Sequence, residues 1–190
     1  MPHRTTPTPR QRLIDAASDL FYAQGIGAVG VDLVSKAAGV SKRTLYAEFG
    51  SKDQLVAQSL DEKGAGVLSL YLPAEGSDEP PRQAILAVFG RLNELTRMDS
   101  YRGCPFINTT TELADAGHPA RRVARDYKLR LRDYFEDQGR RGAADEPGRL
   151  ALQLLAFFDG AIVQAVMGSG LDAGAIRAAV EALLDAQHVG

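Results

Sequence analysis

The sequence has only one cysteine, Cys104, among 190 residues, so it cannot form an intramolecular disulfide bond. This is typical of a protein in a reducing compartment, and no signal peptide precedes the chain, so we expect a cytoplasmic location. A lone cysteine can act as a redox sensor, although it is more often a small buried hydrophobic residue. Redox sensing through Cys104, as part of a regulator, is therefore one of the functions that the sequence allows.

Motifs that assemble a catalytic or metal site are also missing. The sequence has no H-E-x-x-H, no pair of cysteines, no P-loop and no G-x-S-x-G motif. Its histidines are His3, His118 and His188. By spacing, Glu112, Asp115 and His118 could form a metal cluster, but helix ending and capping around Gly117 explain them better. We predict that the protein is not an enzyme and uses no cofactor or metal.

The alternation of polar and β-branched residues that marks strands is not sustained anywhere, and there is no internal repeat. Proline instead stands where helices would begin, because the first helical turn tolerates a residue without an N–H group. These prolines are Pro81, Pro105, Pro119 and Pro147. We therefore predict an all-α protein of about nine helices.

Only one segment, residues 147–167, is apolar over a length that could span a membrane. Arg149 lies near its start, and Gln153, Asp159 and Gln164 interrupt it. A buried or interface helix is the better interpretation, so we expect no membrane partner.

Charge is distributed unevenly along the chain. The formal net charge is −2, but residues 1–60 carry seven cations against five anions, which is +2 and leaves −4 for the remainder. This modest asymmetry argues against a protein that coats nucleic acid generally. It favours binding through a focused patch, with an affinity that falls as salt rises.

Residues 31–52, VDLVSKAAGVSKRTLYAEFGSK, are the most informative part of the sequence. Residues 31–38 place Val31, Val34, Ala37 and Ala38 at helical spacing. Gly39 permits the left-handed backbone that ends a helix, and a second helix then begins at Ser41, which is a good N-cap. The pattern predicts a helix-turn-helix.

The second helix of this motif presents hydrogen-bond donors to solvent. Leu45 and Phe49 lie four residues apart and face the core, which leaves the other side chains outside. The outward residues are Lys42, Arg43, Thr44 and Tyr46. A recognition helix enters the major groove of DNA with such side chains, and Arg43 suits a bidentate bond to a base. A solvated basic face of an ordinary helical hairpin is the alternative.

Residues 9–60 resemble the DNA-binding domain of the tetracycline-repressor (TetR) family of bacterial transcription regulators. The run AAGVSKRTLYAEFGSKDQL is the most specific part of this resemblance. It implies that Ser41, Lys42, Arg43 and Thr44 face the groove and that Tyr46 and Lys52 hold phosphates. The family usually has Thr or Ser where this chain has Gly30, which brings no hydroxyl for a phosphate contact.

The family resemblance also implies a homodimer built from two C-terminal helices of each subunit. Apolar stripes on residues 147–167 and 173–188 would form its four-helix interface. The alternative is that both stripes are buried inside one subunit. The residues assigned to the interface are Leu154, Phe157, Ile176, Val180, Leu183 and Leu184.

Between these helices and the helix-turn-helix, apolar residues and a few hydroxyls have the composition of a small-molecule pocket. Residues 101–119 also resemble, more weakly, a branch of the family with Gly-Cys at the start of the sixth helix. The assigned pocket residues are Phe89, Leu92, Thr96, Cys104, Phe106, Ile107, Thr110, Tyr127, Leu131, Phe158 and Ile162.

We therefore expect a flexible arm at 1–8 and a helix-turn-helix domain at 9–52. A fourth, connecting helix at about 52–70 leads to a regulatory and dimerisation domain at 71–190. The predicted function is that of a ligand-responsive repressor that binds a pseudo-palindromic double-stranded DNA operator and leaves it when a small-molecule effector binds. A helical adaptor that binds another protein is the alternative from a different class.

Overall fold

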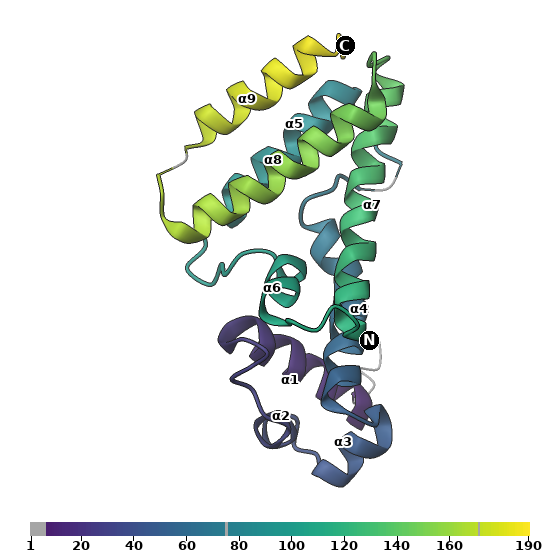
Figure 1. Ribbon diagram of the computed structural model, residues 1–190, viewed down its shortest axis with the longest axis vertical. Helices are drawn as coiled ribbons and strands as arrows, with labels where there is room; N and C mark the ends of the chain where they lie inside the picture. Colours follow the sequence, from purple (N-terminus) through teal and green to yellow (C-terminus); the bar gives the residue numbers. More distant parts are fainter. Residues whose placement is uncertain (1–6, 75, 171) are drawn as a thin grey trace, which may run out of the picture. The chain divides into compact units, whose positions relative to one another are not determined.

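The computed structural model describes residues 7–74, 76–170 and 172–190. Within these residues it contains nine helices and no strand, which confirms the predicted all-α class (Figure 1). The helices are α1 (Pro9–Gln24), α2 (Val31–Ala38), α3 (Lys42–Phe49), α4 (Lys52–Ser69), α5 (Pro81–Leu95), α6 (Pro105–Glu112), α7 (Pro119–Arg141), α8 (Pro147–Met167) and α9 (Ala173–Ala186). Most of the predicted arm lies outside the described residues.

Side-chain caps hold the starts of three helices, and Ser41 is the cap that the sequence predicted. The hydroxyl oxygens of Thr8, Ser41 and Ser51 each accept a hydrogen bond from the backbone N–H three residues later, at 3.1 Å. These bonds satisfy N–H groups that have no partner inside the helix. The sequence Thr8–Gln11 has the form of a capping box, but the side-chain amide of Gln11 donates to Asp15 at 3.2 Å and does not close it.

The turn between α2 and α3 also has the predicted geometry. Gly39 lies in the left-handed region with φ 62°, and its N–H and that of Val40 return to carbonyls of α2. The inward face of α2 differs from the prediction, since Ser35 is buried and Ala37 is exposed. Val34 and Ala38, four residues apart, set the direction of this face, and Ser35 lies beside Val34 on it.

The chain forms two compact units. Among the described residues, the first comprises 7–64 and 105–125, and the second comprises 65–104 and 126–190. The compact units therefore differ from the predicted domains, because α6 and the start of α7 belong with the helix-turn-helix. The reason is packing: Ala120 is fully buried in the core that α1–α4 form, and Leu113 and Val123 pack against that core.

The second unit has an aromatic core. Phe89 stacks on Phe135 with ring centroids 5.9 Å apart, and Phe158 meets Phe89 and Tyr71 edge to face. Such offset and edge-to-face pairs add to the free energy of burial. Lys128 of α7 forms an ion pair with Asp159 of α8 and lies over the ring of Phe158.

Helix α8 alone, among the described residues, is long and apolar enough to cross a membrane by length and composition. Core helices meet the same criterion. In this structure α8 supplies six buried residues to the second unit, as the sequence interpretation expected of a buried helix. They are Leu150, Ala151, Leu154, Phe158, Ala161 and Ile162.

Candidate nucleic-acid interface

Helix α3 presents several polar side chains to solvent. Leu45 and Phe49 are buried, so the opposite side of α3 faces outwards. Lys42 and Arg43 are exposed in its first turn, and Tyr46 is 48% exposed one turn later. Thr44 is half-buried, and its hydroxyl lies 2.9 Å from that of the Ser41 cap. The predicted outward set is thus gathered on one short helix.

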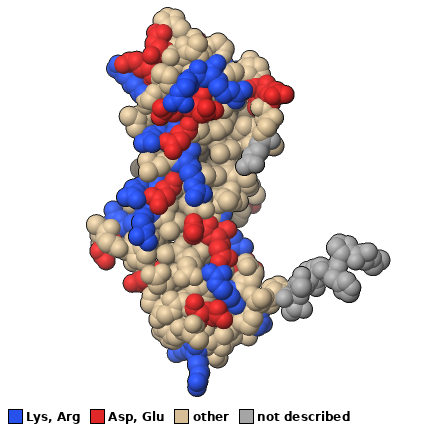
Figure 2. All heavy atoms as spheres, turned by 90° about the vertical axis from the view of Figure 1, so that its right-hand side faces the viewer, with Lys and Arg blue, Asp and Glu red and all other residues tan. Residues whose placement is uncertain are grey.

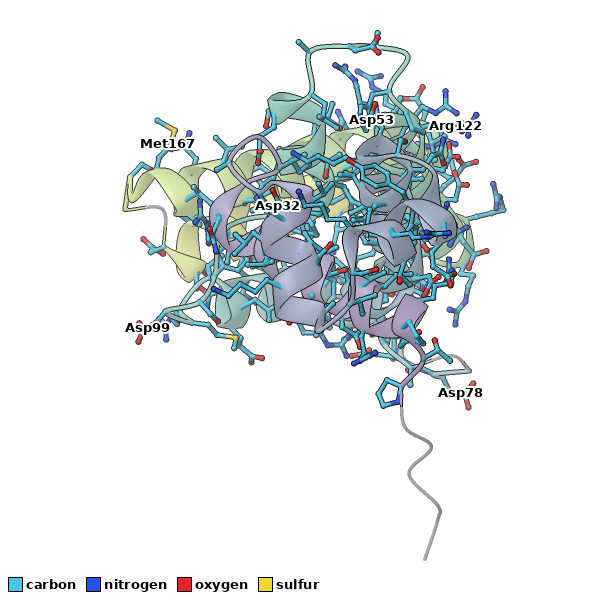
Figure 3. The ribbon with its side chains drawn as sticks, turned by 90° about the horizontal axis from the view of Figure 1, so that it is seen from below. Asp32, Asp53, Asp78, Asp99, Arg122 and Met167 are labelled. Atoms are coloured by element: carbon cyan, nitrogen blue, oxygen red, sulfur yellow. The ribbon has the colours of Figure 1, made fainter. Side chains whose placement is uncertain are left out.

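One of these cations already has an acidic partner. The ammonium group of Lys42 forms an ion pair with the carboxylate of Asp32, which lies in the first turn of α2. Both side chains are more than half exposed. Figure 3 shows Asp32 from below, on the side of the first unit that lies nearest to the viewer. No sequence motif links a first-turn aspartate to the next helix, so this pair could not be predicted from the sequence.

Lys52 has a different surrounding from the one the family resemblance implies. Its ammonium group donates to the carbonyl of Ile26 at 2.7 Å and lies 6.0 Å from the centroid of the Phe21 ring. In this structure Lys52 therefore holds the loop between α1 and α2. Its predicted phosphate contact stays a prediction, and it would compete with this bond.

Glu112 at the end of α6 holds the same loop from another side. Its carboxylate accepts hydrogen bonds from the N–H groups of Ile26, at 2.6 Å, and Gly27, at 3.5 Å. A side chain on Gly25 would point at this carboxylate, with an added Cβ only 3.1 Å away. Glu112 and Lys52 together bind both the N–H and the carbonyl of Ile26, and thereby hold the loop between α1 and α2.

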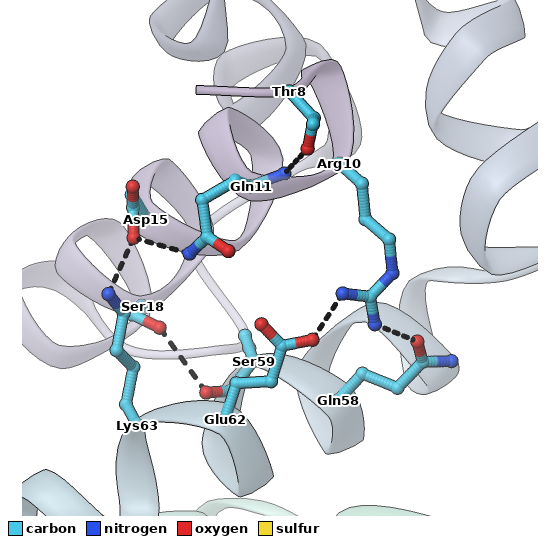
Figure 4. A network of polar contacts seen from close by, with 9 residues as sticks. All are labelled: Thr8, Arg10, Gln11, Asp15, Ser18, Gln58, Ser59, Glu62 and Lys63. Carbon is cyan, nitrogen blue, oxygen red and sulfur yellow. Dashed lines mark hydrogen bonds and ion pairs between the residues drawn. The ribbon is translucent and has the colours of Figure 1, made fainter. Parts of the chain in front are cut away.

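Polar contacts also fasten α1 to α4, as Figure 4 shows. The guanidinium of Arg10 pairs with Glu62, donates to Gln58 at 2.9 Å and lies over the ring of Phe49. Asp15 pairs with Lys63, and this hydrogen-bonded ammonium lowers the pKa of the Asp15 carboxyl below its usual value. These contacts hold α1 against α4 and do not involve the polar side chains of α3.

The three residues that could form a metal cluster by spacing each have their own partner. Glu112 binds the α1–α2 loop, Asp115 accepts from the N–H of Gly117 at 2.8 Å, and His118 accepts from the N–H of Ala120 at 3.1 Å. The ring Nε2 of His118 lies 3.4 Å from Asp53. Among the described residues, no group of three or more such ligands is arranged to hold a metal ion. The capping interpretation accounts for Asp115 and His118.

Four of the six residues assigned to a dimer interface are buried inside the chain itself, so this assignment needs correction. Leu154, Ile176, Val180 and Leu184 belong to the core of the second unit, while Phe157 and Leu183 are half-buried. The inward stripes of α8 and α9 meet each other and α5 instead. The exposed apolar side chains of α8 are Leu152, Val163, Val166 and Met167.

The residues assigned to a ligand pocket divide between the two units. Phe106, Ile107 and Thr110 belong to the first unit, where the hydroxyl of Thr110 donates to the carbonyl of Phe106. The other eight belong to the second unit, and of these all except Thr96 are buried. Cys104 is only 2% exposed, which favours its interpretation as a small buried residue over that as a sensor.

The sequence did not predict one buried polar group near this aromatic core, the hydroxyl of Tyr134. The hydroxyl of Tyr134 is buried without a hydrogen-bond partner among the described residues, and its ring meets Phe135 edge to face. Burial, followed by the charge of Glu79, raises the pKa of Tyr134 to about 12. Charged residues stand on both sides of Tyr134 in the sequence of α7, so the sequence does not indicate that its hydroxyl is buried.

Comparison with known proteins agrees with this geometry. Residues 13–58 match the model of the bacterial regulatory proteins of the tetR family. Curated relatives include the HTH-type transcriptional regulator AcrR of Shigella flexneri, 33% identical over 37% of this chain, and YxaF of Bacillus subtilis, an uncharacterized HTH-type transcriptional regulator, 28% identical over 60%. The aligned regions span only 34% and 61% of these two relatives.

Solved structures extend the likeness to the whole chain. A protein of Streptomyces avermitilis assigned to the TetR transcriptional regulators is 40% identical, with a TM-score of 0.91 over 97% of this chain and 100% of its own. A TetR-family transcriptional regulator of Streptomyces coelicolor is 28% identical, with a TM-score of 0.81 over 95% and 96%. The helix-turn-helix, the helical arrangement and these likenesses together place this chain in the TetR family of bacterial transcription regulators.

Proposed function

We propose that this protein is a sequence-specific DNA-binding transcription regulator that acts as a repressor. The observation that carries the proposal is α3, a short capped helix whose Lys42, Arg43 and Tyr46 project from the first unit while its inner face is locked into the core. A helix of this kind fits the major groove, where side chains at its N-terminal end reach base edges.

Each exposed side chain of α3 has a role set by its chemistry. Arg43 would bond a guanine through its planar fork, and Thr44 would contact a thymine methyl group. Lys42 and the hydroxyl of Tyr46 would hold phosphates, which position the helix without reading sequence. Ser41 both caps α3 and lies at its leading end, so its backbone would approach the groove.

Charge elsewhere supports binding through a focused contact. On the face that Figure 2 shows, lysine and arginine side chains alternate with aspartate and glutamate. A protein that coats DNA would carry a broad surface of one sign. The intermixed charges leave α3, with its clustered donors, as the better candidate for DNA contact.

The regulator would act as a homodimer through the outer face of α8. Leu152 and Met167 are 58% and 70% exposed, and Val163 lies on the same face, about three helical turns from Leu152. An apolar face of this length on one helix is the kind of surface that a second copy covers. A dimer would place two α3 helices on neighbouring major grooves, roughly 34–36 Å apart.

Sedimentation tests this dimer. We expect a species of twice the chain mass of 20.4 kDa at micromolar concentration, and the single-chain mass after Leu152→Glu. Gln164→Glu, an exposed polar position of the same helix, controls for added charge. A wild-type protein that sediments only at 20.4 kDa contradicts the proposal.

The aromatic core of the second unit would receive the effector. Phe89, Phe135 and Phe158 form its walls, and the unpartnered hydroxyl of Tyr134 would provide a polar anchor next to Phe135. An effector that binds the non-operator form ~100-fold better shifts the balance by ~2.7 kcal/mol, enough to release an operator of moderate occupancy. Helix α4 would transmit the change because it runs through both units.

A cytoplasmic location and the absence of enzymatic activity follow from this role and are proposed with it. The competing function, a helical adaptor for another protein, leaves the clustered donors of α3 without a purpose.

Selection of bound duplexes from a random DNA library tests DNA recognition. We expect a pseudo-palindrome to be enriched, and Arg43→Ala to weaken binding to it about 5- to 150-fold, corresponding to one bidentate base contact. Arg97→Ala removes the same charge from an exposed position of the second unit and should leave affinity unchanged. If the 190-residue chain enriches no sequence, with or without cell-extract metabolites, the proposed function is wrong.

A further inference from the structure

We propose that Asp32 is a specificity-determining residue: it withholds Lys42 from DNA in general and releases it only at a correctly seated operator. The proposal rests on the proposed DNA-binding function. It starts from the ion pair that joins the first turn of α2 to the first residue of α3, across the turn of the helix-turn-helix.

The location of Asp32 is favourable for a carboxylate. It lies in the first turn of α2, where the partial positive charge of the helix end favours an anion. Gly30, the N-cap, provides no side-chain hydrogen bond to this end of the helix. The carboxylate of Asp32 thus places a negative charge in the first turn of α2 and weakens the attraction of this helix end for a phosphate.

The pair changes what Lys42 contributes to binding. Sequence-independent affinity comes from cations that neutralise phosphates and release counterions. A lysine that already faces a carboxylate adds no net charge to the surface, so it contributes nothing to this term. Lys36 and Arg43 remain exposed nearby and supply the general attraction.

A specific complex with the operator differs from a nonspecific complex with other DNA in the positions of the phosphates relative to Lys42. When the protein moves along DNA, phosphates lie at variable distances from Lys42, and the carboxylate of Asp32 stays at contact distance. When α3 is fixed in the groove, a phosphate beside its first turn is held at contact distance as well and can replace the carboxylate. Lys42 then strengthens only the specific complex, and Asp32 is the cause of this difference.

The test measures affinity for the selected operator and for a random duplex, each as a function of salt. Asp32→Asn keeps the shape and removes the charge. On random DNA we expect about eightfold tighter binding at 0.1 M salt for each α3 in contact, with a slope of log K against log salt steeper by ~0.9 per contact. Operator affinity should rise less, so the ratio of specific to random affinity should fall.

The double variant Asp32→Asn/Lys42→Met provides a sharper measurement, because it replaces the ion pair by a neutral pair of similar size. Its affinity for random DNA should equal that of the wild type, and its operator affinity should be lower. Asp99→Asn makes the same charge change as Asp32→Asn at an exposed position of the second unit and should alter neither affinity more than twofold.

The outcomes separate the two proposals. Without enrichment of any operator by the wild type, the DNA-binding function fails, whatever the variants do. Once an operator has been selected, the role of Asp32 alone is overturned if Asp32→Asn changes the affinities for operator and random DNA equally, or changes neither. Thermal unfolding of each variant checks folding, which we expect to be unchanged because both side chains are exposed.

Discussion

The first unit, residues 7–64 and 105–125, and the second, residues 65–104 and 126–190, both have apolar cores, but they differ in the interactions that accompany them. In the first, caps and polar contacts orient the helices. Glu112 and Lys52 bind the backbone of Ile26, and two ion pairs, Arg10–Glu62 and Asp15–Lys63, join α1 to α4. In the second, stacked aromatic rings join long helices. Directional hydrogen bonds suit a unit that must present a few side chains in a fixed geometry. Apolar packing suits a unit that is proposed to enclose an apolar effector.

The aromatic core should show the largest effect on stability. Phe135→Ala removes a fully buried ring that stacks on Phe89, and we expect the free energy of unfolding to fall by about 3–5 kcal/mol. Met98→Ala, at an exposed position of the same unit, should change it by less than about 0.5 kcal/mol. Urea unfolding measures both, and similar losses would show that the rings are not the main support of this unit.

A polar tie of the first unit should come next. Glu112→Ala leaves the N–H of Ile26 without its carboxylate partner, which costs about 1–3 kcal/mol. Loosening of the α1–α2 loop should also lower operator affinity. Glu112→Gln keeps an acceptor oxygen and should lose less of both. Equal unfolding free energies for the two variants would mean that the loop does not depend on this bond.

Two helix caps allow a matched comparison between the units. Ser41 caps α3 and Asp172 caps α9, each by accepting from the N–H three residues later. Replacing either by alanine should cost about 1 kcal/mol of stability. Only Ser41→Ala should also weaken operator binding in a mobility-shift titration. A comparable loss of binding in Asp172→Ala would remove the assignment of DNA contact to α3.

The smallest effect on stability is expected at Gly30. This residue has an ordinary extended conformation, and an added Cβ meets nothing within 4 Å, so Gly30→Ser fits without strain. The new hydroxyl can cap α2, which should stabilise the protein by a few tenths of a kcal/mol. It can also bond a phosphate, so operator affinity should rise a few-fold. Unchanged affinity would show that the N-terminus of α2 does not approach DNA.

Much of the first unit could be predicted from the sequence because its signals are local. The caps at Thr8, Ser41 and Ser51 and the left-handed Gly39 act within three or four residues, so a short motif specifies them. The buried position of Ser35 was missed, because helical spacing permitted more than one inward face for α2.

Contacts between distant residues could not be predicted in this way. The hydrogen bond from Lys52 to the carbonyl of Ile26 joins residues 26 positions apart, and no motif signals it. Leu154 and Val180 were assigned to a dimer interface, but the chain itself buries them. An apolar stripe shows that a helix face will be covered, and it does not show by what.

The sequence by itself determined the helical class, the helix boundaries and the outward donors of α3, because caps, glycine and helical periodicity act over a few residues. The tertiary structure decided that α6 and the start of α7 complete the first unit, that Asp32 holds Lys42, and which face of α8 remains exposed. These features depend on which distant surfaces meet, and that is settled only when the whole chain minimises its exposed apolar area and satisfies its buried polar groups together.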